Sequence, residues 1–230
     1  MSRRSTPLPR SFYARPTLTV ARSLLGTHIV RRLNGRRLVG KIVEVEAYIG
    51  FDDPGSHAYR GETKRNAVMF GPPGRAYVYF TYGMHFCFNV VTEREGFPAA
   101  VLLRAVEPEE GIEVMKKLRG RPGNDVDVAN GPAKFCQAFA IDRGFNNEDL
   151  LGDTLFILPV GSRLADDAIE STPRVGLREG VEFPWRFYIK GNPYVSKGKP
   201  LTSSRSSSSH PVPRLAVGDA ASVTQGRRGR

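Results

Sequence analysis

The amino-acid sequence predicts an α+β fold in which one domain is built on an antiparallel β-sheet with helices around it. Short β-prone segments follow one another through turn signals, and only a few segments have the spacing of an amphipathic helix. At 230 residues, 40% of them hydrophobic, the chain is long enough for one sizeable core.

The first predicted elements are a helix and a hairpin. Apolar residues in Leu18–Leu25 recur at helical spacing, and Gly26 is suited to a left-handed cap. Two β-prone segments, Thr27–Leu33 and Arg36–Tyr48, flank Asn34-Gly35, and an Asn-Gly pair in this position is a strong hairpin signal. We therefore expect two antiparallel strands here.

The second of these strands is predicted to carry two carboxylates and a phenol on one face. Strand side chains alternate, so Glu44, Glu46 and Tyr48 point to the same side. Three apolar residues point to the other side: Val43, Val45 and Ala47. The strand leads into a loop at 49–66 that is rich in Gly, Asp and Pro and contains His57. Loops of this length inside a domain tend to be functional.

Arg75–Val91 is predicted to form a second hairpin, with Tyr82 at its tip. A helical turn capped by Thr63 is expected before it. Tyr79 lies on one face of the first strand, and Asn89 is the single amide of the return strand. The aromatic content of this hairpin fits two alternatives, a packed core and the wall of a pocket.

Later segments predict two more helices and three more strands. Ala99–Ala105 is an apolar strand that contains one charge, Arg104. Pro108 has the position of a first-turn proline in a helix that ends near Gly120, and Pro132 begins another helix. The last two predicted strands are 154–158 and 185–190.

The formal charge of +11 is concentrated at the two ends of the chain. Residues 1–22 contain five arginines and no acidic residue, and residues 199–230 contain six basic residues and one acidic residue, so each end carries +5. We expect 1–9 and 199–230 to be disordered basic ends of a folded domain at 10–198. The alternative is that these ends add salt-sensitive affinity for nucleic acid.

The sequence indicates a cytoplasmic protein that does not contact a membrane. No apolar run approaches the roughly 20 residues of a membrane span, and the N-terminus lacks the apolar stretch of a secretory signal. Cys87 and Cys136 lie in apolar segments without the paired spacing of metal ligands, so we expect buried free thiols.

Five side chains are candidates for one site: Glu46, Tyr48, His57, Tyr79 and Asn89. Three rings and an amide suit a planar heterocycle, and a carboxylate beside them can act as a general base on a water molecule. Each residue also has an ordinary structural interpretation, as a surface acid, a loop histidine bonded to the backbone, or an asparagine bonded to the main chain.

A series of motifs from about Leu18 to Ser196 carries a family resemblance. The motifs are EVEAYIG (44–50), SHAYRG (56–61), RN (65–66), MFGPPG and AYVYFTYGMHFCFNVV (69–91), VLLRA (101–105), GPAKFCQA (131–138) and RFY (186–188). In order and spacing they resemble the alkyladenine DNA glycosylases, also called 3-methyladenine or methylpurine DNA glycosylases. The interval of 11 residues from Glu46 to His57 is also the family's interval. Phe135, where an aliphatic residue is expected, should affect packing only.

The resemblance implies a monofunctional DNA glycosylase without lyase activity, metal or cofactor. Such an enzyme flips an alkylated or deaminated purine out of double-stranded DNA and hydrolyses its N-glycosidic bond, which leaves an abasic site. The implied fold is a curved antiparallel sheet like the C-terminal domain of formyltransferases. We expect a monomer that acts in the cytoplasm, at the nucleoid if the source is a bacterium.

The resemblance also implies a role for each candidate residue. Glu46 is the implied general base for the attacking water, and Arg104 orders Glu46 and that water. The remaining roles are a pocket for the extruded base (Tyr48, His57 and Tyr79), exclusion of the amino group of guanine (Asn89) and a wedge in the duplex (Tyr82).

Three other interpretations stay open at this point. A metal-dependent nuclease would use the acidic residues Glu44, Glu46, Asp52 and Asp53 as metal ligands. A noncatalytic nucleic-acid-binding module would have no need of Glu46. A lyase would use Lys41 as its nucleophile.

Overall fold

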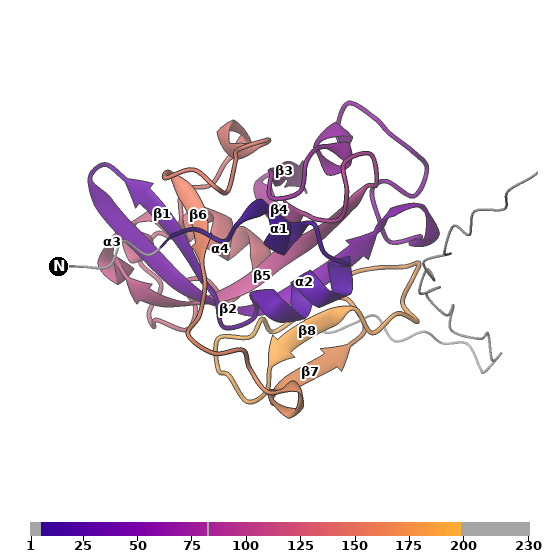
Figure 1. Ribbon diagram of the computed structural model, residues 1–230. Coiled ribbons are helices and arrows are strands. Elements are labelled where there is room, and N and C mark those ends of the chain that lie inside the picture. Colours follow the sequence, from indigo (N-terminus) through magenta and orange to yellow (C-terminus); the bar gives the residue numbers. More distant parts are fainter. Residues whose placement is uncertain (1–5, 82, 199–230) are drawn as a thin grey trace, which may run out of the picture.

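Within residues 6–81 and 83–198, which the structure describes, eight strands form one antiparallel sheet in this computed structural model (Figure 1). Six strands follow the order β3-β4-β5-β2-β1-β6, and β8 joins β2 to β7. The strands are β1 (His28–Leu33), β2 (Arg36–Ile49), β3 (Ala76–Thr81), β4 (His85–Val91), β5 (Ala99–Glu110), β6 (Leu155–Leu158), β7 (Ile169–Thr172) and β8 (Arg186–Ile189). The helices are α1 (Arg10–Tyr13), α2 (Thr17–Leu24), α3 (Ile112–Leu118) and α4 (Pro132–Ala138).

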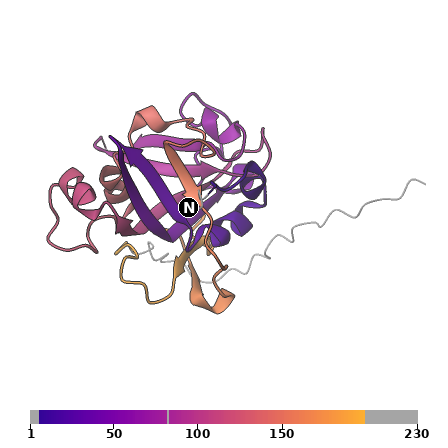
Figure 2. The same cartoon turned by 60° about the vertical axis from the view of Figure 1, so that its left-hand side comes forward.

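The arrangement confirms the predicted α+β class, a single domain with a curled antiparallel sheet and few helices. The turn between β1 and β2 has positive φ angles at Asn34 (49°) and Gly35 (75°), as the Asn-Gly signal predicts. Figure 2 shows this hairpin facing the viewer with β6 beside β1. Both cysteines are free and buried, which was also expected.

Three sequence expectations need correction. The segment before α3 continues β5 to Glu110, so Pro108 is a strand residue, opposite Gly40, and not the first turn of a helix. The register between β2 and β5 shifts at Gly40, and proline is tolerated at such irregularities because no ladder N–H is needed there. In the turn 64–66 the Asn66 N–H does donate to the Thr63 hydroxyl oxygen at 3.4 Å, but this turn leads into a 3-10 helix, Ala67–Phe70, that no side chain caps. The short strand β7 was not predicted, since only one of its four residues is hydrophobic.

β2 is the central strand, because three other strands pair with it. β1 pairs with residues 36–41 and β8 with residues 44–46, while β5 pairs with β2 along 39–49. The register between β2 and β5 shifts on both sides of Glu44, which leaves Val43 on β2 and Arg104 on β5 as extra residues. Such bulges redirect side chains and recur beside active sites.

The main core lies on the face of the sheet that α2 and α4 cover. It contains Val20 and Leu24 of α2, Phe135 of α4 and Val45 of β2. Ile42 joins this core whereas Val43, although buried, does not, so the bulge breaks the strict alternation expected for β2. A smaller cluster forms on the opposite face: Ala58, Met69, Tyr77, Val91 and Ala100.

The folded part of the chain begins before residue 10. Leu8 is buried, and its N–H donates to the carbonyl oxygen of Ile157 at 2.8 Å, so the segment 1–9 is not disordered throughout. Residues 1–5, the tail at 199–230 and the tip residue Tyr82 lie outside the described residues, and the expectations for them stay predictions. In the described part, no helix is long and apolar enough to cross a membrane.

We predict that Gly111→Ala destabilises the fold more than Gly35→Ala does. Both glycines have left-handed backbones, with φ of +79° and +75°, so alanine costs about 1 kcal/mol at either position. A Cβ at Gly111 would also lie 2.6 Å from the Arg37 carbonyl oxygen and from Leu38, whereas nothing lies within 4 Å of one at Gly35. This clash should add roughly 1–3 kcal/mol to the loss of stability of Gly111→Ala. Its urea unfolding should therefore have a lower midpoint concentration than that of Gly35→Ala. Equal midpoints for the two variants would contradict this packing.

Candidate active site

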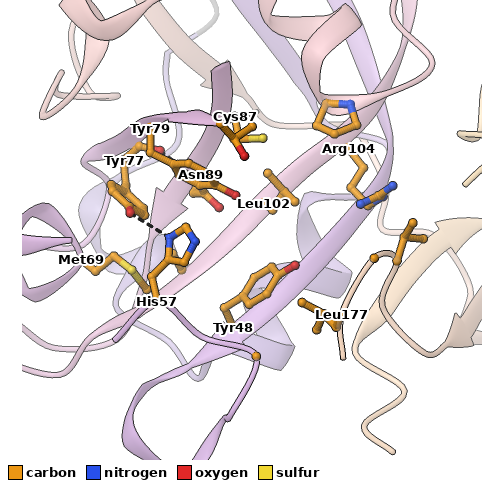
Figure 3. Close-up of a pocket in the computed structure, with 16 residues that line it drawn as sticks. Tyr48, His57, Met69, Tyr77, Tyr79, Cys87, Asn89, Leu102, Arg104 and Leu177 are labelled. Atoms are coloured by element: carbon orange, nitrogen blue, oxygen red, sulfur yellow. Dashed lines mark hydrogen bonds between the residues drawn. The ribbon is translucent and has the colours of Figure 1, made fainter. Parts of the chain in front are cut away.

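Side chains from four neighbouring strands, β3, β4, β5 and β2, converge on one cavity of about 230 Å³ (Figure 3). The rest of its wall comes from loop 50–66, Met69, Pro132 and segment 174–177. The lining residues are Tyr48, Gly55, His57, Met69, Tyr77, Tyr79, Thr81, Cys87, Asn89, Ala100, Leu102, Arg104, Pro132, Val175, Gly176 and Leu177. The cavity lies on the face of the sheet opposite the main core, because lining and core residues alternate along β3 and β4.

Three rings form one wall of this cavity. His57 packs edge-on against Tyr79, with 4.5 Å between ring centroids, and Tyr77 lies 5.3 Å from Tyr79. The Nδ1 atom of His57 is 3.0 Å from the Tyr77 hydroxyl oxygen. His57 and Tyr79 therefore contact each other directly, and Tyr77, which the sequence interpretation left out of the site, holds the histidine in place.

The backbone of the His57 loop is held by Asn66. The side-chain Nδ2 of this buried residue donates to the carbonyl oxygens of His57, at 2.8 Å, and of Gly61, at 3.0 Å. The side-chain oxygen accepts a hydrogen bond from the Thr63 N–H at 2.6 Å. One buried amide thus ties together the loop that carries the histidine.

Asn89 is also buried and lies on β4, opposite Tyr77 in the sheet register. Its Nδ2 donates to the carbonyl oxygen of Tyr77 at 2.9 Å. This bond uses one of the two N–H groups of the amide, so the second N–H and the amide oxygen are the polar groups of Asn89 that are available to the cavity.

Glu46 lies directly behind the cavity wall and is fully buried, with 0% of its surface exposed. Its Oε1 accepts a hydrogen bond from the Val175 N–H at 2.7 Å. Its Oε2 accepts one from the Tyr48 hydroxyl at 2.9 Å and lies 3.2 Å from Nη1 of Arg104. All three partners line the cavity, so the carboxylate is held just behind that wall.

Protonation of the two side chains around Glu46 follows from their surroundings. Burial, and then the charge of Glu46, raise the pKa of Tyr48 well above its ordinary value, so the phenol keeps its proton and donates a hydrogen bond to the carboxylate. Burial alone would lower the pKa of Arg104, but the carboxylates of Glu46 and Glu44 outweigh it and raise that pKa. Arg104 is therefore a permanent cation beside Glu46.

A second ion pair holds the loops on either side of the cavity. The guanidinium of Arg174 binds the carboxylate of Asp53 through two contacts of 2.6 Å, and both side chains are fully buried. Nη1 of Arg174 also donates to the Ala47 carbonyl oxygen at 2.9 Å, and the guanidinium lies over the Tyr48 ring at 4.7 Å. The pair joins the loop that bears His57 to segment 174–177.

The structure brings together six of the seven site residues predicted from the sequence. Tyr48, His57, Tyr79, Asn89 and Arg104 line the cavity, and Glu46 is bonded to two of them. Tyr82 lies outside the described residues, so its role stays a prediction. The sequence interpretation missed the Asp53–Arg174 pair, because the two residues are 121 positions apart and neither lies in a motif that signals such a pair.

The structure does not bring together the carboxylates that a metal-dependent nuclease would use as metal ligands. Asp53 is bound by Arg174 and Glu44 by Arg104 and Arg186, while Asp52 is exposed. Among residues 6–81 and 83–198, no group of three or more His, Cys, Asp or Glu side chains is placed to hold a metal ion. Lys41, the lysine considered for a lyase, does not line the cavity; its Nζ pairs with the Glu107 carboxylate at 2.6 Å.

A second hollow, of about 510 Å³, adjoins the cavity and shares Tyr79 with it. Three basic side chains line it, Lys64, Arg65 and Arg143, and no acidic side chain does. Within the described part of the chain, none of the three forms an ion pair with an acidic residue. The other lining residues are Val78, Phe80 and Asn146.

Comparison with known proteins gives one consistent result. Residues 11–193 match the model of a family described as methylpurine-DNA glycosylase (MPG). A protein of Carboxydothermus hydrogenoformans is 54% identical over 190 residues, which cover 83% of this chain and 98% of that protein. A relative from Methanocella arvoryzae is 49% identical (84% and 97% covered), and one from Streptomyces avermitilis 46% (87% and 95% covered). All three carry the name "Putative 3-methyladenine DNA glycosylase".

We predict that the His57 ring stays neutral down to about pH 5, well below the ordinary histidine pKa. Although His57 as a whole is exposed, partial burial of its ring against the tyrosines, and then the charge of Arg65, lower the pKa of His57 from 6.5 to about 4. Because the unfolded chain binds this proton near pH 6.5, the contribution to stability is present above pH 6.5 and is lost as the pH falls through 4.

Histidine-ring NMR between pH 8 and 4 measures this titration directly, with His57→Gln to assign the resonance. Between pH 8 and 4, the free energy of unfolding of His57→Gln should fall less than that of the wild type. The matched control is His28→Gln, a change outside the cavity. A His57 resonance that titrates near pH 6.5 is the outcome that would contradict the prediction.

Proposed function

Because the chain belongs to the methylpurine-DNA glycosylase family, we propose that it excises alkylated purines such as 3-methyladenine from double-stranded DNA, with Glu46 as the general base. The observation that carries this proposal is the position of Glu46. It is a buried carboxylate, and all three groups that bond to it line a cavity.

The size of the cavity supports a single base as its ligand. At about 230 Å³ it is smaller than the roughly 300–1,000 Å³ of sites for drug-sized molecules. A base stacked inside a duplex is out of reach of such a cavity, so the nucleotide has to be flipped out, at a cost of a few kcal/mol that is smallest for damaged pairs. Tyr82, at the tip between β3 and β4, is proposed to fill the space that the base leaves.

The charge state of the wall suits a cationic base. Alkylation at a ring nitrogen gives the purine a positive charge, and the faces of Tyr77 and Tyr79 attract a cation by about 0.5–2 kcal/mol. His57, whose pKa of about 4 keeps it neutral at pH 7, adds no repelling charge. The positive charge of Arg104 is matched by Glu44 and Glu46.

In the proposed reaction a water oxygen bonds to C1′ of the deoxyribose while the C1′–N bond breaks. The electron pair of that bond leaves with the purine, and a proton of the water passes to Glu46. Oε1 of Glu46 accepts a single hydrogen bond from the protein, from Val175, so it keeps a lone pair for this water. The negative charge of Glu46 also stabilises the positive charge that develops on the sugar.

Two further roles follow from the same arrangement. Asn89, held by its bond to Tyr77, is proposed to exclude the exocyclic amino group of an undamaged guanine, since an unmatched amine in a buried site is strongly disfavoured. Release of the free base without a lyase step fits the position of Lys41, which pairs with Glu107 and does not line the cavity.

The second hollow is proposed to bind the DNA backbone. Lys64, Arg65 and Arg143 line it beside Tyr79, so phosphates next to the flipped nucleotide would meet three basic side chains. Contacts of this kind position a protein on DNA and carry no sequence information. They suit an enzyme that must find a damaged base in any sequence.

We predict that Glu46→Gln binds a lesion-containing duplex with nearly wild-type affinity but releases the base about 10²- to 10⁴-fold more slowly, the usual contribution of a general base. Single-turnover release of free base, together with a binding titration, separates the two effects. Glu110→Gln, a change of an exposed glutamate at the end of β5, is the matched control and should keep the wild-type rate.

Different outcomes of this experiment identify different errors. Excision by Glu46→Gln at the wild-type rate would remove the general base from the proposal. Loss of wild-type activity in excess chelator, or a strand break in place of an abasic site, would favour the nuclease. Lesion binding without excision by the wild type would favour a noncatalytic binding module.

We also predict that Arg143→Gln weakens DNA binding to the same extent on damaged and undamaged duplexes. Loss of one phosphate contact should reduce the slope of log K against log salt concentration by about 0.9, while the excision rate of bound substrate stays unchanged. Arg163→Gln, at an exposed arginine that lines neither hollow, is the control. An unchanged salt slope for Arg143→Gln would place the DNA backbone elsewhere.

A further inference from the structure

Segment 194–198 packs against the groups that hold Glu46, although the family match ends at residue 193. The key residue is Ser196, which is 9% exposed. Its backbone N–H donates to Oε2 of Glu44 at 2.7 Å, and its hydroxyl donates to Oε1 of Glu44 at 2.9 Å. The same hydroxyl oxygen accepts a hydrogen bond from Nη2 of Arg104 at 3.4 Å.

These bonds divide the donors of Arg104 among three acceptors. Nε donates to Oε1 of Glu44 at 2.9 Å, Nη2 to the hydroxyl of Ser196, and Nη1 lies 3.2 Å from Oε2 of Glu46. A planar guanidinium held on two of its sides has little freedom to rotate. The direction of Nη1 toward Glu46 is therefore set by Glu44 and Ser196.

The buried cluster is balanced in charge but depends on its hydrogen bonds. Two carboxylates, Glu44 and Glu46, face two guanidiniums, Arg104 and Arg186, whose Nε atom is 2.7 Å from Oε1 of Glu44. Glu44 accepts four hydrogen bonds, and two of them come from Ser196. Buried ions are stable only when such bonds are satisfied, so Ser196 is part of what keeps Glu44 in position.

The residues after Ser196 stay close to the same groups. A Cβ built on Gly198 would lie 2.8 Å from Cγ1 of Val175 and 3.2 Å from Nη2 of Arg104. Val175 is the residue whose N–H donates to Oε1 of Glu46. The end of the described chain is thus in contact with two of the three groups that bind the carboxylate.

We infer that Ser196 is a positioning residue for base excision: its hydroxyl fixes Arg104 and Glu44, and Arg104 in turn fixes Glu46 for its reaction with water. This inference rests on the proposed function of Glu46. It extends the active site to a segment that follows residue 193, where the match to the family model ends. Ser196 acts through Arg104 and Glu44 and does not line the cavity.

The test compares Ser196→Ala, Ser196→Thr and Ser171→Ala in the full chain. Ser196→Ala removes the hydroxyl but keeps the backbone bond to Glu44, Ser196→Thr keeps the hydroxyl, and Ser171 is an exposed serine on β7. For Ser196→Ala we expect a roughly 10- to 100-fold lower rate of base release at saturating enzyme, because small displacements of catalytic groups have effects of this size. The Kd for the same lesion-containing duplex should change less than twofold, and Ser196→Thr should recover most of the rate.

Each outcome decides between a positioning and a structural role. A rate for Ser196→Ala equal to that of Ser171→Ala would overturn the inference, and so would a rate for Ser196→Thr as low as that for Ser196→Ala. Thermal unfolding of each variant gives its folded fraction, to which the rates are normalised. Glu46→Gln in the same assay separates the two proposals. If Glu46→Gln releases no base while Ser196→Ala releases it at the wild-type rate, only the role of Ser196 fails. If Glu46→Gln itself releases base at the wild-type rate, the proposed function of Glu46 fails.

Discussion

The burial of two carboxylates on one strand is the constraint on which the rest of this structure depends. Glu44 and Glu46 are both fully buried in β2, and an uncompensated charge at either position would cost several kcal/mol. Two guanidiniums offset these charges, Arg104 from β5 and Arg186 from β8. The need to bring both arginines to β2 explains why this strand pairs with β5 and β8 at the same residues.

The same constraint shapes the cavity. Arg104 occupies the extra position in β5 where the register with β2 shifts, so the irregularity of the sheet directs the guanidinium toward the glutamates. A second buried pair, Asp53 with Arg174, joins the His57 loop to segment 174–177. Both pairs also make hydrogen bonds to the backbone, although Nε of Arg174 has no partner among the described residues, and such networks make a site rigid. A rigid wall around this cavity suits the base excision that we propose for this chain.

Local sequence patterns predicted which residues form the site better than they predicted the partners of those residues. Alternation along β2 correctly placed Glu46 and Tyr48 on one face, and alternation along β3 and β4 placed Tyr79 and Asn89 on the cavity side. The helix predicted to end near Gly120 does form, as α3, but its predicted start at Pro108 was wrong, because a proline suits a first helical turn as well as a sheet irregularity. Sequence proximity suggested Asp52 and Asp53 as a metal site, whereas Asp53 is bound by a distant arginine.

The sequence by itself determined the α+β class, the two hairpins and five of the residues that line the cavity: Tyr48, His57, Tyr79, Asn89 and Arg104. These features depend on alternation, turn chemistry and motif spacing, which act over a few residues or are kept within a family. Only the tertiary structure decided the partners of the buried charges, from Asp53 with Arg174 to Glu44 with Ser196. These pairs are separated by 121 and 152 positions, and electrostatic pairing depends on distance in space, which no local pattern encodes.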